Sequence, residues 1–244
     1  MLGFNRYKAL TFDCYGTLID WETGITDWVR VRQMDTDVPD ELILSAFAMM
    51  QAKHQQVRPV LLYPEVLRRT WRDIEATFGW ESKPEHAESF ADSVGNWSPF
   101  ADTIGSLQYL ARFYKLGILS NIDNASLKRT MTRLAVPFDL TVTAEDVGSY
   151  KPDVAHFETA LARLAAHGIA RNEVLHVAQS KHHDVKTGRD LGLPCVWVNR
   201  RNSKKGSGAT LAGNAEPNLT VTSLAELVKL HEAQNVASIE GSVT

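Results

Sequence analysis

The stretch LTFDCYGTLID, residues 10–20, decides the fold that this sequence predicts. The apolar run that ends at Phe12 is typical of a buried parallel strand. The acid Asp13 follows directly, and a turn with Gly16 and the hydroxyl of Thr17 comes next. Open α/β sheets bind their ligands at the carboxyl ends of the strands, and glycine lets the backbone turn back over the acid. We interpret Asp13 as a nucleophile and the rest of the chain as its support.

Size and composition indicate an ordinary globular enzyme. The 244 residues allow one large domain or a core with a smaller insert. The net charge of −3 gives no basic face, so nucleic acid is not an expected partner. Residues 1–8 lack the apolar core of a signal peptide, and no run approaches the roughly 20 apolar residues of a membrane span. The two cysteines, Cys14 and Cys195, exclude a disulfide framework. We expect a cytoplasmic enzyme without a membrane partner.

The chain divides by its periodicity. Residues 25–97 show apolar side chains at helical spacing and no strand pattern. After Pro99 strands alternate with helices, which predicts an α/β fold with a Rossmann-like, doubly wound parallel sheet. The strands are expected at 7–12, 116–119, 140–143, 174–178, 196–199 and 219–221, and the helices at 102–113, 125–134, 155–167, 184–191 and 223–233. We therefore predict a core domain of residues 1–20 and 99–244, with a helical cap domain of residues 21–98 inserted after the first strand.

Polar residues stand at four expected strand ends. Besides Asp13 these are the pair at 120–121, the loop that holds Lys151, and the segment 180–184. Because the carboxyl ends of parallel strands share one edge of the sheet, these groups are expected to converge on one site.

Here the sequence resembles the haloacid dehalogenase superfamily. The segments that carry the resemblance are Asp13 to Leu18, Leu119 to Asn121, Tyr150 to Asp153 and Ser180 to Asp184, in that order. The chain is most similar to the metal-independent branch, the (S)-2-haloacid dehalogenases and relatives that include an azetidine-2-carboxylate hydrolase. The resemblance implies a hydrolase of small carboxylic acids that uses water and forms an aspartyl ester, with no cofactor and no metal.

The resemblance also assigns roles to the matching residues. Asp13 would attack carbon, Lys151 would hold Asp13 ionised, and Asp184 would pair with Lys151 and position water. Three residues would donate hydrogen bonds to the nucleophile or to the substrate carboxylate: Thr17, Ser120 and Asn121. The remaining predicted substrate-binding residues are Tyr15, Trp21 and Ser180. A purely structural interpretation, in which an acid such as Asp184 only caps its helix, stays open.

Some positions depart from the family pattern. No arginine stands where the dehalogenases place their halide-binding residue, and Arg58 is displaced from it. Phe157 replaces an expected tyrosine, and the fourth motif reads QSKHH at 179–183. These changes strengthen the case for ring-opening relatives, for which His182 or His183 would supply a proton. The preferred prediction remains a hydrolase of the 2-haloacid dehalogenase type, with the ring-opening hydrolase as the alternative. For both histidines, a surface or structural role is the competing interpretation.

Two further classes of protein fit this sequence less well. Superfamily phosphatases carry a second aspartate where this chain has Tyr15, and an acid pair for magnesium whose first member is Ser180 here. Without those acids a magnesium-dependent phosphatase is disfavoured. A non-catalytic binding protein would have no need of an ionisable nucleophile beside Lys151. The apolar helical faces of the insert are core or a homodimer contact, which the sequence does not separate.

Overall fold

The strands form one sheet with the opening stretch at its centre. The structure is a computed structural model that describes residues 2–34, 36–202 and 204–240. Within these residues six parallel strands pair in the order β3-β2-β1-β4-β5-β6. Their bounds are β1 Ala9–Phe12, β2 Lys115–Ser120, β3 Leu140–Thr143, β4 Val174–Ala178, β5 Cys195–Val198 and β6 Leu219–Val221. Every residue of β1 is buried, as expected for a strand with neighbours on both sides.

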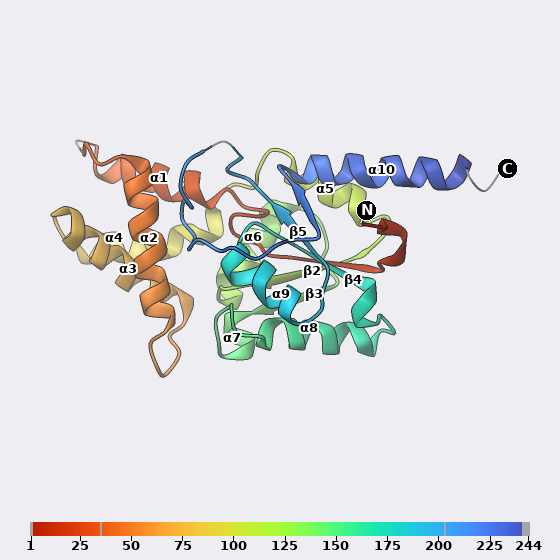
Figure 1. Cartoon of the computed structure of the whole chain (residues 1–244). Coiled ribbons are helices and arrows are strands. Elements are labelled where there is room, and N and C mark those ends of the chain that lie inside the picture. The colour runs from red at the N-terminus through yellow and green to blue at the C-terminus, as the bar shows by residue number, and fades with distance from the viewer. Residues whose placement is uncertain (1, 35, 203, 241–244) are drawn as a thin grey trace.

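Helices cover both faces of this sheet. Figure 1 shows α5 and α10 along one side of the strands and α7 and α8 along the other. Side chains of α5 and α10 share a cluster with Leu10 and Phe12, whereas those of α8 share a second cluster with Ala9. The helical elements of this part are η1 Phe4–Arg6, α5 Thr103–Leu110, α6 Asn124–Leu134, α7 Ala144–Val147, α8 Ala155–Ala166, η3 Arg171–Glu173, η4 Lys181–Val185, α9 Lys186–Asp190 and α10 Leu224–Glu240. This is the predicted α/β, Rossmann-like arrangement.

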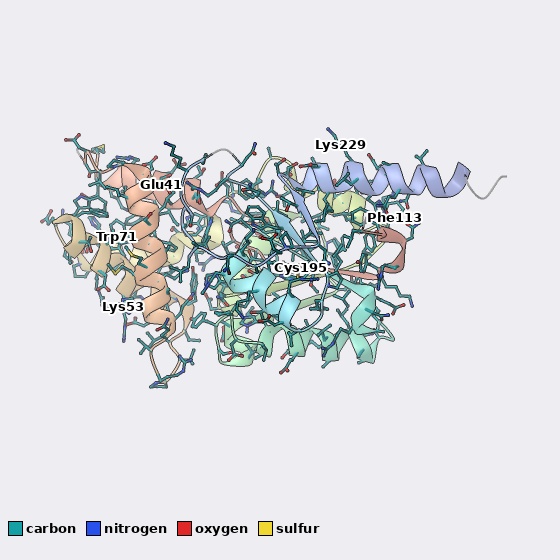
Figure 2. All side chains as sticks on the ribbon, in the orientation of Figure 1. Glu41, Lys53, Trp71, Phe113, Cys195 and Lys229 are labelled. Carbon is teal, nitrogen blue, oxygen red and sulfur yellow. The ribbon has the colours of Figure 1, made fainter. Side chains whose placement is uncertain are left out.

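Four of the helices between β1 and β2 pack together at one end of the sheet (Figure 1). We call them the insert: α1 Trp21–Arg32, α2 Asp40–Gln55, α3 Tyr63–Phe78 and α4 Pro84–Ser93, followed by the short η2 Val94–Asn96. Trp71 is fully buried at the centre of the insert, and Cys195 is fully buried in the core. Figure 2 shows both, with Lys53 and Lys229 on the outside.

Glycine and proline set the limits of α3 as its sequence indicates. Pro64 lies in the first turn, where its missing N–H is not needed. Gly79 ends the helix at φ +68°, a left-handed conformation that glycine adopts without strain. Between them Val66, Leu67 and Trp71 are buried.

The structure corrects three expected helices. The helix at 102–113 ends at Leu110, because the chain turns there to enter β2 at Lys115. The helix expected from Asp184 begins earlier, with a π-helical turn from Lys181. The last helix continues to Glu240 instead of ending near residue 233.

Contacts with the N-terminal segment accompany the longer last helix. Gln234 accepts a hydrogen bond from the Phe4 backbone and donates one to the Leu2 carbonyl. The buried ring of His231 packs against Phe4 and Tyr109. Of the tail expected to fray, residues 241–244 lie outside the described residues.

Several general expectations concern the whole chain. Among the described residues no helix is both long and apolar enough to cross a membrane. The homodimer stays a prediction. Large apolar side chains exposed on the insert include Leu42 and Met49, seven residues apart on α2.

Candidate active site

A small pocket lies where the carboxyl ends of β1, β2 and β4 meet the insert. Its cavity measures about 30 Å³, the space of one or two water molecules. The lining residues are Asp13, Tyr15, Trp21, Gln51, Tyr63, Ser120, Asn121, Lys151, Gln179, Ser180, His183, Asp184 and Thr210. Eight of the nine predicted site residues belong to this set, and the ninth, Thr17, bonds directly to Asp13.

Asp13, Lys151 and Asp184 form the charged centre of the pocket. The Lys151 ammonium donates to Asp13 Oδ1 at 2.9 Å and to Asp184 Oδ1 at 2.6 Å. Its third donor position reaches the Leu119 carbonyl at 2.8 Å. All three charged side chains are buried, so a cation between two anions limits the cost of removing these charges from water.

The two carboxylates differ in acidity. Burial raises the pKa of Asp13 above its ordinary value, although the Lys151 ammonium and the Thr17 hydroxyl oppose the rise. Burial would also raise the pKa of Asp184, but Lys151 and His176 outweigh it and hold that pKa well below its ordinary value. For Lys151 burial disfavours the charge, yet the neighbouring carboxylates raise its pKa. An environment that separates the pKa values of two carboxyl groups is typical of sites in which they do different chemistry.

The turn after β1 fixes the orientation of Asp13. Thr17 donates from Oγ1 to Asp13 Oδ2 at 2.7 Å and accepts from the Gln179 backbone at 2.8 Å. Gly16 has φ +91°, and a Cβ there would lie 2.9 Å from the Trp21 indole nitrogen. A side chain at residue 16 would therefore be strained and would clash with the pocket wall.

Asn121 holds the loop that carries Lys151. Its side chain accepts from the Lys151 N–H at 2.7 Å and donates to the Lys151 carbonyl at 3.1 Å. This paired contact fixes the Lys151 backbone. Of the two expected contacts of Asn121, with Asp13 or with the substrate carboxylate, the first is not among the hydrogen bonds of the described residues. Asn121 is instead linked to Asp13 through Lys151.

The other predicted residues form the walls of the pocket. The Tyr15 hydroxyl turns away to Thr130 at 2.6 Å, leaving only the ring to the pocket. Ser180 begins the π-helical turn η4, and its Oγ accepts from the His183 backbone at 3.0 Å. Trp21 begins α1 and lines the pocket from the insert.

Four lining residues were not predicted as site residues from the sequence. Gln51 and Tyr63 come from the insert and bond to each other, with the Tyr63 hydroxyl donating to Gln51 Oε1 at 2.9 Å. Gln179 Oε1 is buried without a partner among the described residues. Thr210 lies in the loop between β5 and β6, and it is buried. Gln51 had a signal, since it falls in the segment where the family's arginine is expected. Gln179 also had one, since it opens the fourth-motif segment at 179–183, whereas Tyr63 and Thr210 had none.

Three departures from the family pattern have clear positions. Arg58 lies outside the pocket and donates to backbone carbonyls of its own segment. Phe157 is fully buried and packs against the His176 ring, with centroids 4.9 Å apart. His183 lines the pocket, and burial lowers its pKa to about 4. At neutral pH His183 is therefore an uncharged group, which weakens its expected role as a proton donor. His182 is not one of the lining residues.

The donor set does not fit a magnesium ion. Among the described residues no group of three or more His, Cys, Asp and Glu side chains is arranged to hold a metal. Asp13 and Asp184 each give one oxygen to the Lys151 ammonium. A hard cation requires several oxygen ligands at close range, and an ammonium between the only two carboxylates of the pocket lining repels it.

The fold and this site define a class: an α/β enzyme with an aspartate at the end of its central strand. The model of the haloacid dehalogenase-like hydrolase family matches residues 65–198, more than half of the chain. The protein belongs to this family and is a hydrolase.

Individual relatives add detail. The chain is 26% identical over 227 residues to (S)-2-haloacid dehalogenase of Pseudomonas putida, which covers 90% of this chain and 94% of that protein. It is 30% identical over 146 residues to a pyrimidine 5′-nucleotidase of Escherichia coli. That alignment covers 59% of this chain and 61% of that protein.

Solved structures share the fold. L-2-haloacid dehalogenase from Xanthobacter autotrophicus with chloropropionic acid covalently bound superposes with a TM-score of 0.76 at 21% identity, covering 93% of this chain and 98% of that one. A HAD-hydrolase from Bacillus subtilis bound to magnesium gives 0.72 at 18% identity, covering 92% and 98%. Identities this low show the fold alone.

Proposed function

We propose that this protein hydrolyses a small 2-substituted carboxylic acid of the 2-haloacid type through an ester on Asp13, without a metal ion. The observation that carries the proposal is the buried Asp13–Lys151–Asp184 cluster in a pocket of small volume. The relatives named (S)-2-haloacid dehalogenase, which align over most of both chains, support the substrate class.

In the first step an Asp13 carboxylate oxygen attacks the substituted carbon. The carbon–oxygen bond forms as the bond to the leaving group breaks, and the leaving group departs with the electron pair. Thr17 and Lys151 each donate to one oxygen of Asp13 and so fix its orientation for attack. A substrate carboxylate would take its hydrogen bonds from Ser120 and other lining side chains.

In the second step water attacks the ester at the Asp13 carbonyl carbon. Asp184 would receive the proton of that water, since its Oδ2 is buried and has no partner among the described residues. The hydroxy acid then leaves with the proton that Asp184 received, and the second proton of the water passes to solvent as the Asp13 carboxylate is regenerated.

We further propose that residues 21–98 act as a cap domain over a core of residues 1–20 and 99–244. Trp21, Gln51 and Tyr63 support this, because they bring the insert into the pocket wall. Arg201 of the core also pairs with Glu22 and Glu41 of the insert.

A ring-opening hydrolase, of the azetidine-2-carboxylate type, is the second candidate. The observation that favours it is the neutral Gln51–Tyr63 pair, because Gln51 lies in the segment where a halide-binding arginine is expected. A cyclic amine remains attached to the product after ring opening and needs no anion cradle. The two candidates share Asp13 and differ only in what it displaces.

A magnesium-dependent phosphatase is a further alternative, because the chain is similar to a nucleotidase. Such an enzyme needs an acid to protonate the leaving oxygen. The hydroxyl at the corresponding position, that of Tyr15, is buried against Thr130, and burial raises its pKa well above the ordinary value.

A substrate panel separates these functions. The protein would be incubated in EDTA with each enantiomer of 2-chloropropionate and with azetidine-2-carboxylate, and separately with p-nitrophenyl phosphate with and without magnesium. We expect chloride or ring-opened acid in EDTA, and no product from an Asp13→Asn variant whose circular dichroism matches the wild type. Phosphate release that requires magnesium, with neither acid turned over, would contradict the proposal.

A further inference from the structure

A buried histidine stands behind the charged cluster, where the mechanism so far gives it no part. His176 lies in β4, paired in register with Thr11 of β1, and its side chain is fully buried. Its ring packs edge-on against Phe157 of α8. A polar ring in the middle of a sheet needs hydrogen-bond partners, because an unpaired buried polar group is costly.

Both ring nitrogens have a partner, and the partners fix the tautomer. Nε2 lies 3.2 Å from Asp184 Oδ1, and a carboxylate that is held ionised can only accept. Nε2 therefore carries the proton. In a ring that carries this single proton, Nδ1 accepts from the Thr11 hydroxyl, which lies 2.9 Å away.

The hydrogen bond from His176 helps to fix the rotation of the Asp184 carboxylate. Oδ1 of Asp184 receives two donors, Lys151 Nζ and His176 Nε2. Oδ2 of the same carboxylate receives none among the described residues, although it is buried. Two donors on one oxygen hold the carboxylate in one rotation and leave the other oxygen for water.

We propose that His176 is a positioning residue for the second step, acting through Asp184. It fixes the rotation in which Asp184 Oδ2 is available to the water that hydrolyses the Asp13 ester, and Thr11 fixes the tautomer of His176. The inference rests on the proposed ester mechanism. It leaves the first step to Asp13, Thr17 and Lys151; no hydrogen bond among the described residues joins His176 to any of the three.

The proposal predicts a selective defect. In His176→Met the ring's donor is lost while an unbranched apolar side chain occupies the space. Ester hydrolysis should slow at least about tenfold, a part of what a positioned base contributes, while ester formation stays within about threefold. Rapid mixing would then show one equivalent of leaving group released quickly, and intact-mass spectrometry would show the ester accumulating on the enzyme.

Two control variants test whether slower ester hydrolysis comes from loss of the His176 donor. His176→Gln can place an N–H near the position of Nε2, so it should restore most of the hydrolysis rate. Leu175→Val removes packing from the opposite face of the same strand, where Leu175 belongs to the other buried cluster. It should lower stability without ester accumulation.

The outcomes distinguish a failure of the proposed role of His176 from a failure of the proposed function. A wild-type enzyme that turns over substrate without ever carrying an ester overturns both. A wild-type ester with a His176→Met variant that slows both steps equally, or neither, overturns the role of His176 alone. If His176→Met does not fold, Thr11→Val carries the test, since it removes the hydroxyl that holds the tautomer and should slow ester hydrolysis selectively by about threefold. Unchanged hydrolysis in that variant would equally contradict the role.

Discussion

At the scale of single residues, Lys151 is the group on which the site depends. Its side chain is almost completely buried between two carboxylates, and its backbone is held at both polar atoms by Asn121. A buried charge without its partner is far more costly than an exposed one. Lys151 therefore opposes the rise in the pKa of Asp13 that burial causes, and its ammonium joins groups at the ends of β1, β2 and β4.

Replacing Lys151 by Met should destabilise the protein by about 3–5 kcal/mol, because two buried carboxylates lose their cation. Urea unfolding at neutral pH measures the change. Lys115 offers a matched control, since it also pairs with an aspartate, Asp139, at 2.8 Å but in a largely exposed position. Lys115→Met should cost at most about 1 kcal/mol. Equal costs for the two variants would contradict the buried cluster.

The strand-end residues could be predicted from sequence, and the insert residues could not. Asp13, Ser120 and Asp184 follow strands whose apolar runs are visible, and parallel strands bring such ends to one edge. Gln51 and Tyr63 lie on two helices whose rotation depends on packing between the insert and the core. Their helical periodicity gives the buried face but not the residue that meets the pocket.

At the scale of elements, the α2–α3 pair brings two neutral side chains to the pocket. Gln51 lies near the end of α2 and Tyr63 at the start of α3, and their hydrogen bond joins the two helices at the pocket wall. In the core, the turn η4 likewise brings side chains to the pocket. Its Ser180 carbonyl accepts from the Asp184 and Val185 backbones, a widened turn of the kind often found at functional sites.

Tyr63→Phe keeps the ring and removes only the hydroxyl that orients Gln51. Loss of one such bond is worth about 1 kcal/mol, so kcat/KM should fall about fivefold. Steady-state kinetics on the substrate found in the panel measures it. Tyr114→Phe is the control, because its hydroxyl is buried at the opposite side of the core against the Phe4 carbonyl. A change in kcat/KM for Tyr114→Phe as large as for Tyr63→Phe would argue against a specific role for the α2–α3 contact.

In the whole molecule, the order of the sheet places the strands that lead to candidate site residues, β2, β1 and β4, side by side. β1 lies between β2 and β4, so Asp13 faces groups that come more than a hundred residues later. The alternation of strands and helices predicted this sheet. It did not predict that the loop after β5 reaches the insert through Arg201, because the partners Glu22 and Glu41 are remote in sequence.

The pH dependence of stability tests the packing of α8 on the sheet. Burial, with a smaller effect of Lys151, lowers the pKa of His156 to about 4, while the unfolded chain has an ordinary value near 6.5. Between these values the unfolded state binds a proton that the folded state does not, so stability falls as the pH decreases from 7 towards 4. From pH 7 to pH 5 this one group should cost about 2 kcal/mol.

His156→Gln removes the titration and can keep the hydrogen bond to the Ser120 carbonyl. Urea unfolding at pH 7 and pH 5 should give a loss of stability about 2 kcal/mol smaller for the variant than for the wild type. His167 follows α8 in an exposed position, so His167→Gln provides the control for loss of a histidine at the surface. Parallel curves for all three proteins would show that His156 is not held neutral by burial.

The central claim is that Asp13 attacks carbon and becomes an ester. One turnover in ¹⁸O-water, with enzyme in excess over the substrate found in the panel, tests it most directly. Because water attacks the Asp13 carbonyl in this mechanism, the product's new hydroxyl should contain ¹⁶O, and mass spectrometry of the peptide with residues 9–20 should place ¹⁸O on Asp13. Product that carries ¹⁸O, with no label on Asp13, would contradict the account.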